Sequence, residues 1–151
     1  MSGADGPAAV APALRPATVD DVPAVLAFWR LAAEDRHRPA DTAAALGALL
    51  ARDPDALILA WAGAELVGTV IAGWDGWRCR LYRLAVAPGY RGRGLARTLV
   101  EAAEQRFRAF GGTRVDALVL DDNTLAEPAW RAFGYEPRPE WAPWSRSLST
   151  D

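Results

Sequence analysis

Hydrophobic residues recur every three to four positions in three stretches of the chain, a spacing typical of helices with one buried face. The first stretch covers residues 20–35 and begins at Asp20, a residue type that often caps a helix N-terminus. The second begins at Asp41 and covers residues 41–53. The third covers residues 93–110 and ends before two consecutive glycines, which favour a helix stop. The pattern therefore predicts three helices at these positions.

Between the second and third helices, the pattern changes to short apolar runs separated by turn residues, which is typical of strands. Similar runs occur near both ends of the chain, and a short helix is expected at residues 125–133. The expected strands cover residues 13–18, 56–63, 65–74, 79–87, 114–121 and 143–148. The order βααβββαβαβ predicts an α/β (α+β) fold, with a mixed, mostly antiparallel sheet and helices on both of its faces.

Length and charge narrow the class of protein. The chain has 151 residues, of which 51% are hydrophobic and 24% charged, enough for one packed domain. We expect that domain to cover residues 13–151, after a disordered lead of residues 1–12. The net charge of -2 argues against a nucleic-acid partner, and the longest apolar runs are shorter than the roughly 20 residues that cross a bilayer.

The single cysteine, Cys79, cannot form an internal disulfide, which favours a reducing compartment. The N-terminal segment lacks a positively charged start and is interrupted by Pro7 and Pro12, unlike a secretory signal peptide. A cytoplasmic protein is therefore expected. One histidine, one cysteine and scattered carboxylates give no ligand spacing for a metal, so no metal cofactor is expected.

Residues 84–100 combine a strand, a glycine-rich turn and the start of a helix. Gly92 and Gly94 let the backbone approach a ligand, and the N–H groups of the first helical turn attract anions. Six arginines and no acidic residue lie between positions 76 and 100, so a pyrophosphate is the favoured ligand. A P-loop is excluded because the chain has no lysine, and a dinucleotide fingerprint because Arg97 stands where it needs glycine.

The same stretch resembles the acyl-CoA signature of the GNAT superfamily of N-acetyltransferases. That signature reads Gln/Arg-x-x-Gly-x-Gly/Ala, and residues 91–96 have the sequence RGRGLA. Residues 84–88 resemble the family's fourth strand and its exit, and residues 123–135 resemble a later Asn-x-x-Ala…Gly-Phe/Tyr block. The resemblance covers about residues 13–148. Residues 73–88 resemble a bacterial subgroup with a Gly-Trp-Asp-Gly-x-Arg hairpin, most of whose members have no defined acceptor.

The resemblance implies an acetyltransferase that uses acetyl-CoA as its acyl donor, held between two splayed strands at residues 79–87 and 114–121. A backbone N–H near Leu84 or Ala85 would stabilise the oxyanion formed when the acceptor attacks. The residues implied in cofactor binding are Leu84, Ala85, Val86, Arg91, Gly92, Arg93, Gly94, Leu95, Ala96, Asn123 and Trp130. The acceptor would be a primary amine of a small molecule, protein or peptide, and a homodimer is the family-based expectation.

The chain departs from the family at the proton donor. Trp130 stands where many members have a tyrosine that protonates the departing CoA thiolate, and an indole cannot supply that proton at neutral pH. Tyr82 is the catalytic candidate in its place, although a tyrosine packed in the core is an equally open interpretation. Because a thiol with a pKa of about 8.5 is a tolerable leaving group, water is a further candidate donor.

The acceptor site is the least defined part of the prediction. Glu34, in the loop between the first two helices, and Asp75 and Trp77, in the hairpin, are the candidate substrate-binding residues. An aromatic ring near acidic groups would suit a cationic amine, whereas the alternative is that these residues are ordinary solvated surface positions. Because no general base stands out, a non-catalytic acyl-CoA-binding sensor or regulatory module remains the alternative function.

Overall fold

The computed structural model describes residues 11–32, 41–119 and 126–149. Contacts along the chain divide it into two units, residues 1–118 and residues 119–151, which are described separately. The predictions that residues 1–12 form a disordered lead and residues 13–151 a single domain remain predictions; residues 1–10 lie outside the described part. In the ranges that are described, no helix has both the length and the apolar character needed to cross a bilayer.

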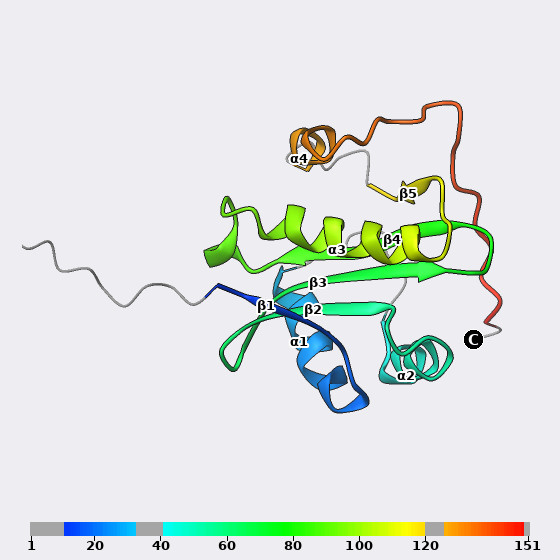
Figure 1. Cartoon of the computed structure of the whole chain (residues 1–151). Coiled ribbons are helices and arrows are strands. Elements are labelled where there is room, and N and C mark those ends of the chain that lie inside the picture. The colour runs from blue at the N-terminus through cyan, green and yellow to red at the C-terminus, as the bar shows by residue number, and fades with distance from the viewer. Residues whose placement is uncertain (1–10, 33–40, 120–125, 150–151) are drawn as a thin grey trace, which may run out of the picture. The chain divides into compact units, whose positions relative to one another are not determined.

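The first unit is built on a five-stranded sheet (Figure 1). Its strands are β1 Ala13–Pro16, β2 Leu57–Ala62, β3 Glu65–Trp74, β4 Cys79–Val86 and β5 Val115–Ala117. They lie side by side in the order β1-β2-β3-β4-β5. The pairs from β1 to β4 are antiparallel, and β5 runs parallel to β4. The predicted mixed, mostly antiparallel sheet is thus confirmed.

Helices cover both faces of this sheet, as predicted. Helices α1 (Val22–Ala32) and α2 (Ala43–Arg52) lie on one face, and α3 (Leu95–Ala109) lies on the other (Figure 1). Side-chain alternation along β3 explains the two layers. Thr69 accepts a hydrogen bond from Trp29 of α1, whereas a Cβ added at the neighbouring Gly68 would lie 2.9 Å from Leu99 of α3.

A hydrophobic cluster lies on the side of α1 and α2. It joins the apolar faces of these two helices to side chains from β2 and β4, so burial of one continuous surface fixes the helices to the sheet. Its buried members are Ala17, Val22, Val25, Trp29, Leu46, Leu50, Leu57, Leu59 and Ala85. On the opposite face, the buried positions of α3 are Leu95, Leu99, Val100, Ala103 and Phe107.

The predicted helix caps were wrong by one or two residues. Thr42, not Asp41, caps α2, because its hydroxyl accepts the backbone N–H of Ala45 at 3.0 Å. A short 3-10 turn, η1 (Val19–Asp21), precedes α1, and Asp20 lies inside it. Asx and Thr side chains cap equally well, so only the path of the backbone decides which of two neighbours is used.

Among its described residues, the second unit has one short helix, α4 (Glu127–Ala132), followed by a chain without regular structure up to residue 149. The strand predicted at residues 143–148 was wrong. Residues 141–149 have no regular structure, and the apolar side chains of Trp144 and Leu148 are 96% and 90% exposed. The strand predicted at residues 114–121 is shorter than expected, since β5 covers only Val115–Ala117.

The start of the first unit contains an ion pair that should make its stability fall in acid. Arg15 donates two hydrogen bonds to the Asp21 carboxylate, at 2.7 and 3.0 Å, and the backbone N–H of Thr18 donates a third at 2.8 Å. These hydrogen bonds lower the pKa of Asp21 from 3.8 to about 2, and those from Arg15 have the largest effect. The unfolded chain therefore takes up the proton first as the pH falls, and the stabilisation is lost.

We expect this group to stabilise the fold by about 1–2 kcal/mol above pH 5, discounted for the half-exposed arginine, and to lose that contribution between about pH 4 and pH 2. Urea unfolding of the D21N variant and the unmodified protein at pH 7 and pH 3 measures it. The difference in unfolding free energy between the two proteins should shrink at pH 3. A difference that stays constant would contradict the assignment.

Candidate active site

Strand β4 is paired with β5 along only its first part. Cys79, Arg80 and Leu81 are opposite Val115, Asp116 and Ala117, and the register then ends. In the described part of the chain, residues 82–86 have no strand on that side, although Tyr82, Ala85 and Val86 remain paired with β3 on the other. The second half of β4 therefore presents its edge, with the hydrogen-bonding groups of a strand, to a ligand.

A bulge lies where the pairing with β5 has ended. Thr69 is opposite Ala85 and Ile71 is opposite Tyr82, so β4 has one more residue in this interval than β3. Arg83, inside the interval, has a φ of 52°, the one positive φ of a non-glycine residue among the described segments. A bulge of this kind bends the strand and changes the direction of its groups. The bend occurs beside the unpaired edge.

Polar side chains from the neighbouring elements hold the bulge. The Thr69 hydroxyl donates to the carbonyl oxygen of Arg83 at 2.8 Å and accepts from the indole N–H of Trp29 at 2.9 Å. The Arg83 side chain is 7% exposed, forms an ion pair with Asp41, and has its guanidinium carbon 5.1 Å from the centre of the Trp29 ring. A buried cation is stable only with such partners.

The turn after β4 exposes backbone N–H groups at a helix N-terminus. A 3-10 turn, η2 (Pro88–Tyr90), leads to Gly92 and Gly94, whose φ values are 75° and 80°, and α3 begins at Leu95. No described side chain caps this helix, and Thr98 donates back to the Gly94 carbonyl instead. The first amides of α3 are therefore left for an anionic ligand.

Two arginines of this turn make contacts within the protein. Arg91 donates to the carbonyl oxygens of Val86 and Ala32, at 3.1 and 3.2 Å, and so ties the end of β4 to the last residue of α1. The guanidinium of Arg93 lies 5.2 Å from the ring centre of Tyr90. Together with the buried Arg83, these contacts show that part of the positive charge predicted to gather here holds the structure together.

The comparisons with known proteins agree with this geometry. The model of the Acetyltransferase (GNAT) family matches residues 23–135, which include the bulged strand and the turn. The chain belongs to this family. An acetyltransferase of Pectobacterium atrosepticum is 34% identical over 118 residues, covering 78% of this chain and 82% of that protein, and one of Sodalis glossinidius is 33% identical with the same coverage. The protein is thus an acetyltransferase, as predicted.

Solved structures of low sequence identity share the fold. Ard1 from Thermoplasma volcanium has a TM-score of 0.71 and 20% identity, with 83% of this chain and 82% of that chain covered. An aminoglycoside 6'-N-acetyltransferase from Acinetobacter haemolyticus has a TM-score of 0.70 and 18% identity, with 91% and 99% covered. These similarities confirm the predicted GNAT fold and carry no information about the acceptor.

In this GNAT protein, Tyr82 is not a core residue. Its side chain is 38% exposed, and its ring lies 3.0 Å from the position that a Cβ of Gly73 would occupy. Gly73 and Thr69 are four positions apart on β3 and so share a face, and Thr69 contacts α1. The bulge therefore places Tyr82 and Arg83, although adjacent in sequence, on the same face of the sheet.

The hairpin that carries two acceptor candidates is held by its own residues. The Asp75 carboxylate accepts the backbone N–H groups of Trp77 and Arg78 at 2.8 and 2.6 Å, and these bonds lower its pKa. Trp77 is 73% exposed, and the Arg78 guanidinium lies 3.9 Å from its ring centre. Asp75 thus shapes the turn, and one face of the indole already contacts a cation.

Three predicted site residues cannot be placed beside the turn. Glu34 and Asn123 fall in residues 33–40 and 120–125, outside the described residues. Trp130 belongs to the second unit, where its ring packs edge-on against Phe133 and Tyr135, with ring centres 5.8 and 5.1 Å apart. Asp41 and Thr69 were not among the site residues predicted from the sequence. Both contact Arg83, which lies 42 positions from Asp41 and 14 positions from Thr69.

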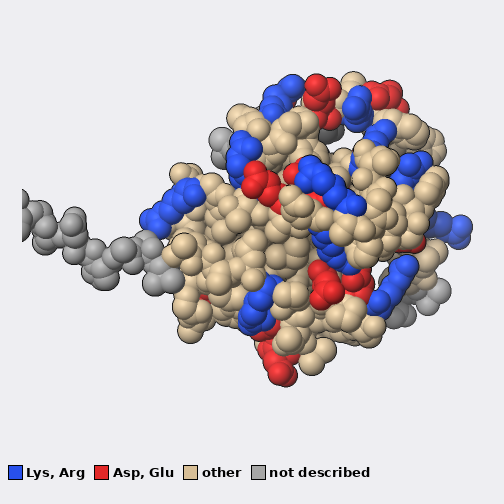
Figure 2. Space-filling view, in the orientation of Figure 1, with Lys and Arg blue, Asp and Glu red and all other residues tan. Residues whose placement is uncertain are grey.

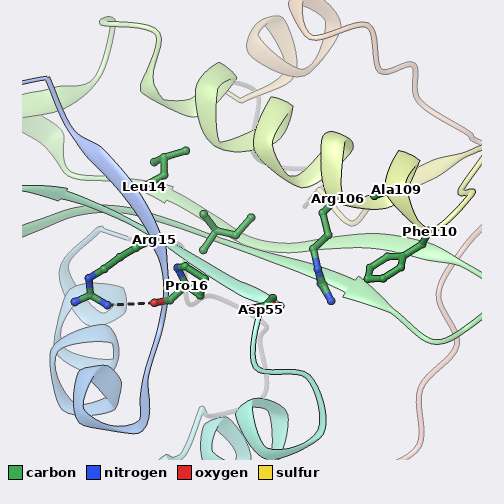
Figure 3. A pocket seen from close by; sticks show the side chains of 8 residues that line it. Leu14, Arg15, Pro16, Asp55, Arg106, Ala109 and Phe110 are labelled. Atoms are coloured by element: carbon green, nitrogen blue, oxygen red, sulfur yellow. Dashed lines mark hydrogen bonds between the residues drawn. The ribbon is translucent and has the colours of Figure 1, made fainter.

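One cavity of this protein lies away from the glycine-rich turn. It has a volume of about 360 Å³ and is lined by Leu14, Pro16, Ile58 and Phe110, with Arg106 at its wall (Figure 3). Phe110 follows the last residue of α3, whereas the glycine-rich turn precedes its first, so the two features lie at opposite ends of that helix. The cavity therefore adds nothing to the candidate active site.

Charge is spread over the viewed face of the molecule. Figure 2 shows basic and acidic side chains interspersed there, rather than one basic patch. In the described ranges, no group of three or more His, Cys, Asp or Glu side chains is arranged as a metal site. Burial is the main cause that raises the pKa of the Cys79 thiol. This cysteine is therefore neutral at pH 7 and a poor nucleophile.

Proposed function

We propose that this acetyltransferase uses acetyl-CoA and transfers its acetyl group directly to a primary amine of a small molecule, protein or peptide. The observation that carries the proposal is the unpaired second half of β4, which leads straight into uncapped amides at the start of α3. An extended arm with amide groups fits the first feature, and a pyrophosphate fits the second. Acetyl-CoA contains both groups in one molecule.

The residues that would hold the cofactor follow the chain from β4 into α3. Backbone groups of Leu84 and Val86 are proposed to pair with the amides of the pantetheine arm. The backbone N–H groups of residues 91–96 are proposed to bind the pyrophosphate, because the positive φ values of Gly92 and Gly94 turn that backbone into a concave anion site. Arg93 is proposed to add a charge-assisted contact.

Bound acetyl-CoA supplies an activated acetyl group, whose bond to sulfur breaks as its bond to the amine nitrogen forms. A backbone N–H of Leu84 or Ala85 is proposed to donate to the developing oxyanion, as a fixed dipole in the right place costs no reorganisation. The nitrogen releases its proton to solvent water, and the sulfur gains one from a donor that solvent then reprotonates. The half-exposed phenol of Tyr82, on the face shared with Arg83, is the proposed donor to sulfur.

Trp77 and Asp75 remain the proposed acceptor-side residues of the described chain, together with Glu34. If a cationic acceptor stacks on the second face of the Trp77 indole, the W77A variant should raise the KM for that amine about two- to fivefold, the size of an exposed cation–π contact. The Kd for acetyl-CoA should not change. W144A, which removes an exposed tryptophan of the second unit, is the matched control. Unchanged acceptor kinetics in W77A would remove Trp77 from the site.

Calorimetric titration with acetyl-CoA, followed by measurement of thiol release against a panel of primary amines, tests the function. Micromolar binding with amine-dependent thiol release would support the proposal. Binding without release for any amine would favour the alternative, an acyl-CoA-binding sensor that does not catalyse transfer. No binding at millimolar acetyl-CoA or CoA would overturn the assignment of the turn after β4 as a cofactor site.

A further inference from the structure

We propose that Arg83 is a positioning residue for acyl transfer, which acts through the shape of β4 and is held in place by Asp41, Trp29 and Thr69. The inference rests on the proposed function, since it concerns the strand segment assigned to the reacting thioester. It adds a role for a side chain whose described contacts are with Asp41 and Trp29.

The backbone of Arg83 is in a conformation that it would not adopt unaided. A φ of 52° places an L-residue with a long side chain in the left-handed region, where Cβ crowds its own backbone. Such a conformation persists only where the surroundings over-determine it. Here it lies one residue before Leu84, whose N–H is a proposed oxyanion donor, so a relaxed φ would redirect that N–H.

Trp29 takes part in two of the contacts that hold Arg83. Through its indole N–H it fixes the Thr69 hydroxyl, which donates to the Arg83 carbonyl oxygen at 2.8 Å. Through the face of its ring it supports the guanidinium, 5.1 Å from the ring centre. The backbone and the side chain of Arg83 are thus both anchored to one rigid, 2% exposed residue of α1.

Asp41 supplies a negative charge beside the buried guanidinium. It lies immediately before Thr42, the N-cap of α2, so its backbone is anchored by the start of that helix. Replacing the carboxylate with a neutral amide removes this countercharge from a buried cation. The side chain is then expected to move towards water and to release the bulge.

The chain offers a matched control for this ion pair. Arg106 of α3 forms a comparable, partly buried pair with Asp53, and it also donates to the carbonyl oxygen of Ala72 at 2.8 Å. That pair contacts β3 at Ala72, which is opposite Leu81 and so outside the bulged interval. Loss of either carboxylate should lower thermal stability, but only the loss of Asp41 should alter the reacting segment of β4.

The test compares D41N with D53N in thiol-release kinetics, acetyl-CoA titration and thermal unfolding. We expect D41N to lower kcat tenfold or more while the Kd for acetyl-CoA rises much less, about threefold at most, because the proposed pyrophosphate amides are unchanged. D53N should leave kcat within twofold despite a similar fall in Tm. If both variants lose kcat in proportion to their fall in Tm, or if D41N keeps its kcat, the positioning role is overturned.

Thr69 provides a second test that leaves the buried arginine in place. T69V removes the hydroxyl at nearly constant volume and should lower kcat about tenfold, whereas T69S retains the hydroxyl and should recover most of the rate. Equal rates in the two variants would contradict the proposal. An unmodified protein that binds acetyl-CoA but releases no thiol would overturn the transferase function itself, a result distinct from an active protein that tolerates D41N and T69V.

Discussion

Replacing Gly94 with valine is expected to weaken acetyl-CoA binding by tenfold or more while the protein stays folded. Gly94 has a φ of 80°, and no described atom lies within 4 Å of the position its Cβ would take. The cost of the substitution is therefore conformational, about 1–2 kcal/mol for an L-residue and more for a β-branched one. The backbone can relieve that cost only by rotating the first amides of α3 out of the proposed pyrophosphate site.

Gly89 is the matched control for this experiment. It lies in the same turn, also has no described atom within 4 Å of the position its Cβ would take, and does not have a left-handed φ. G89A should bind acetyl-CoA within twofold of the unmodified protein. Calorimetric Kd values and Tm for both variants decide the matter. A G94V variant with full affinity would show that the turn does not bind the cofactor through its backbone.

The glycine-rich turn before α3 could be predicted because its backbone geometry is decided locally. Whether Gly92 and Gly94 adopt positive φ, and whether a helix starts behind them, is decided within residues 88–98. The faces of the helices were predictable for a similar reason, since a repeat of three to four residues places Val22, Val25 and Trp29 on one side of α1 whatever lies against it.

The bulge in β4 could not be predicted, because it depends on partners far away in the sequence. Arg83 is an ordinary strand position in the pattern of residues 79–87, and only Thr69 and Asp41 reveal that its backbone and side chain are both held. Its burial also runs against the usual preference of arginine for solvent. A pattern of polar and apolar residues records such preferences, not the exceptions that a three-dimensional site requires.

The arginines illustrate the same limit. The sequence shows six of them without an acidic neighbour between positions 76 and 100, which predicts a strongly positive site. In the structure, the carboxylate of Asp41 reaches Arg83 from 42 residues away, and main-chain carbonyls of Val86 and Ala32 engage Arg91. Backbone amides, which carry no signature in the composition, are then left as the larger part of the proposed anion site.

Replacing Gly112 with alanine is expected to destabilise the fold by about 2–3 kcal/mol and to lower Tm by roughly 5–10 °C. Gly112 follows the end of α3, and a Cβ there would lie 2.5 Å from the Sγ atom of Cys79 and 3.0 Å from the backbone oxygen of Phe107. The carbonyl cannot rotate away, because it accepts the Gly112 N–H at 2.8 Å. The end of α3 must therefore move off the first residue of β4.

The G112A prediction is separated from a general glycine effect by two further variants. G47A, inside α2 with no described atom within 4 Å of the new methyl group, should raise stability by about 0.5–1 kcal/mol. C79A removes the sulfur, so G112A should cost about 1 kcal/mol less in that background. Urea unfolding of the single variants and the double variant gives the coupling. Additive effects of G112A and C79A would show that the turn and β4 do not make this close contact. The contact lies at the end where β4 and β5, the proposed cofactor-binding strands, are paired.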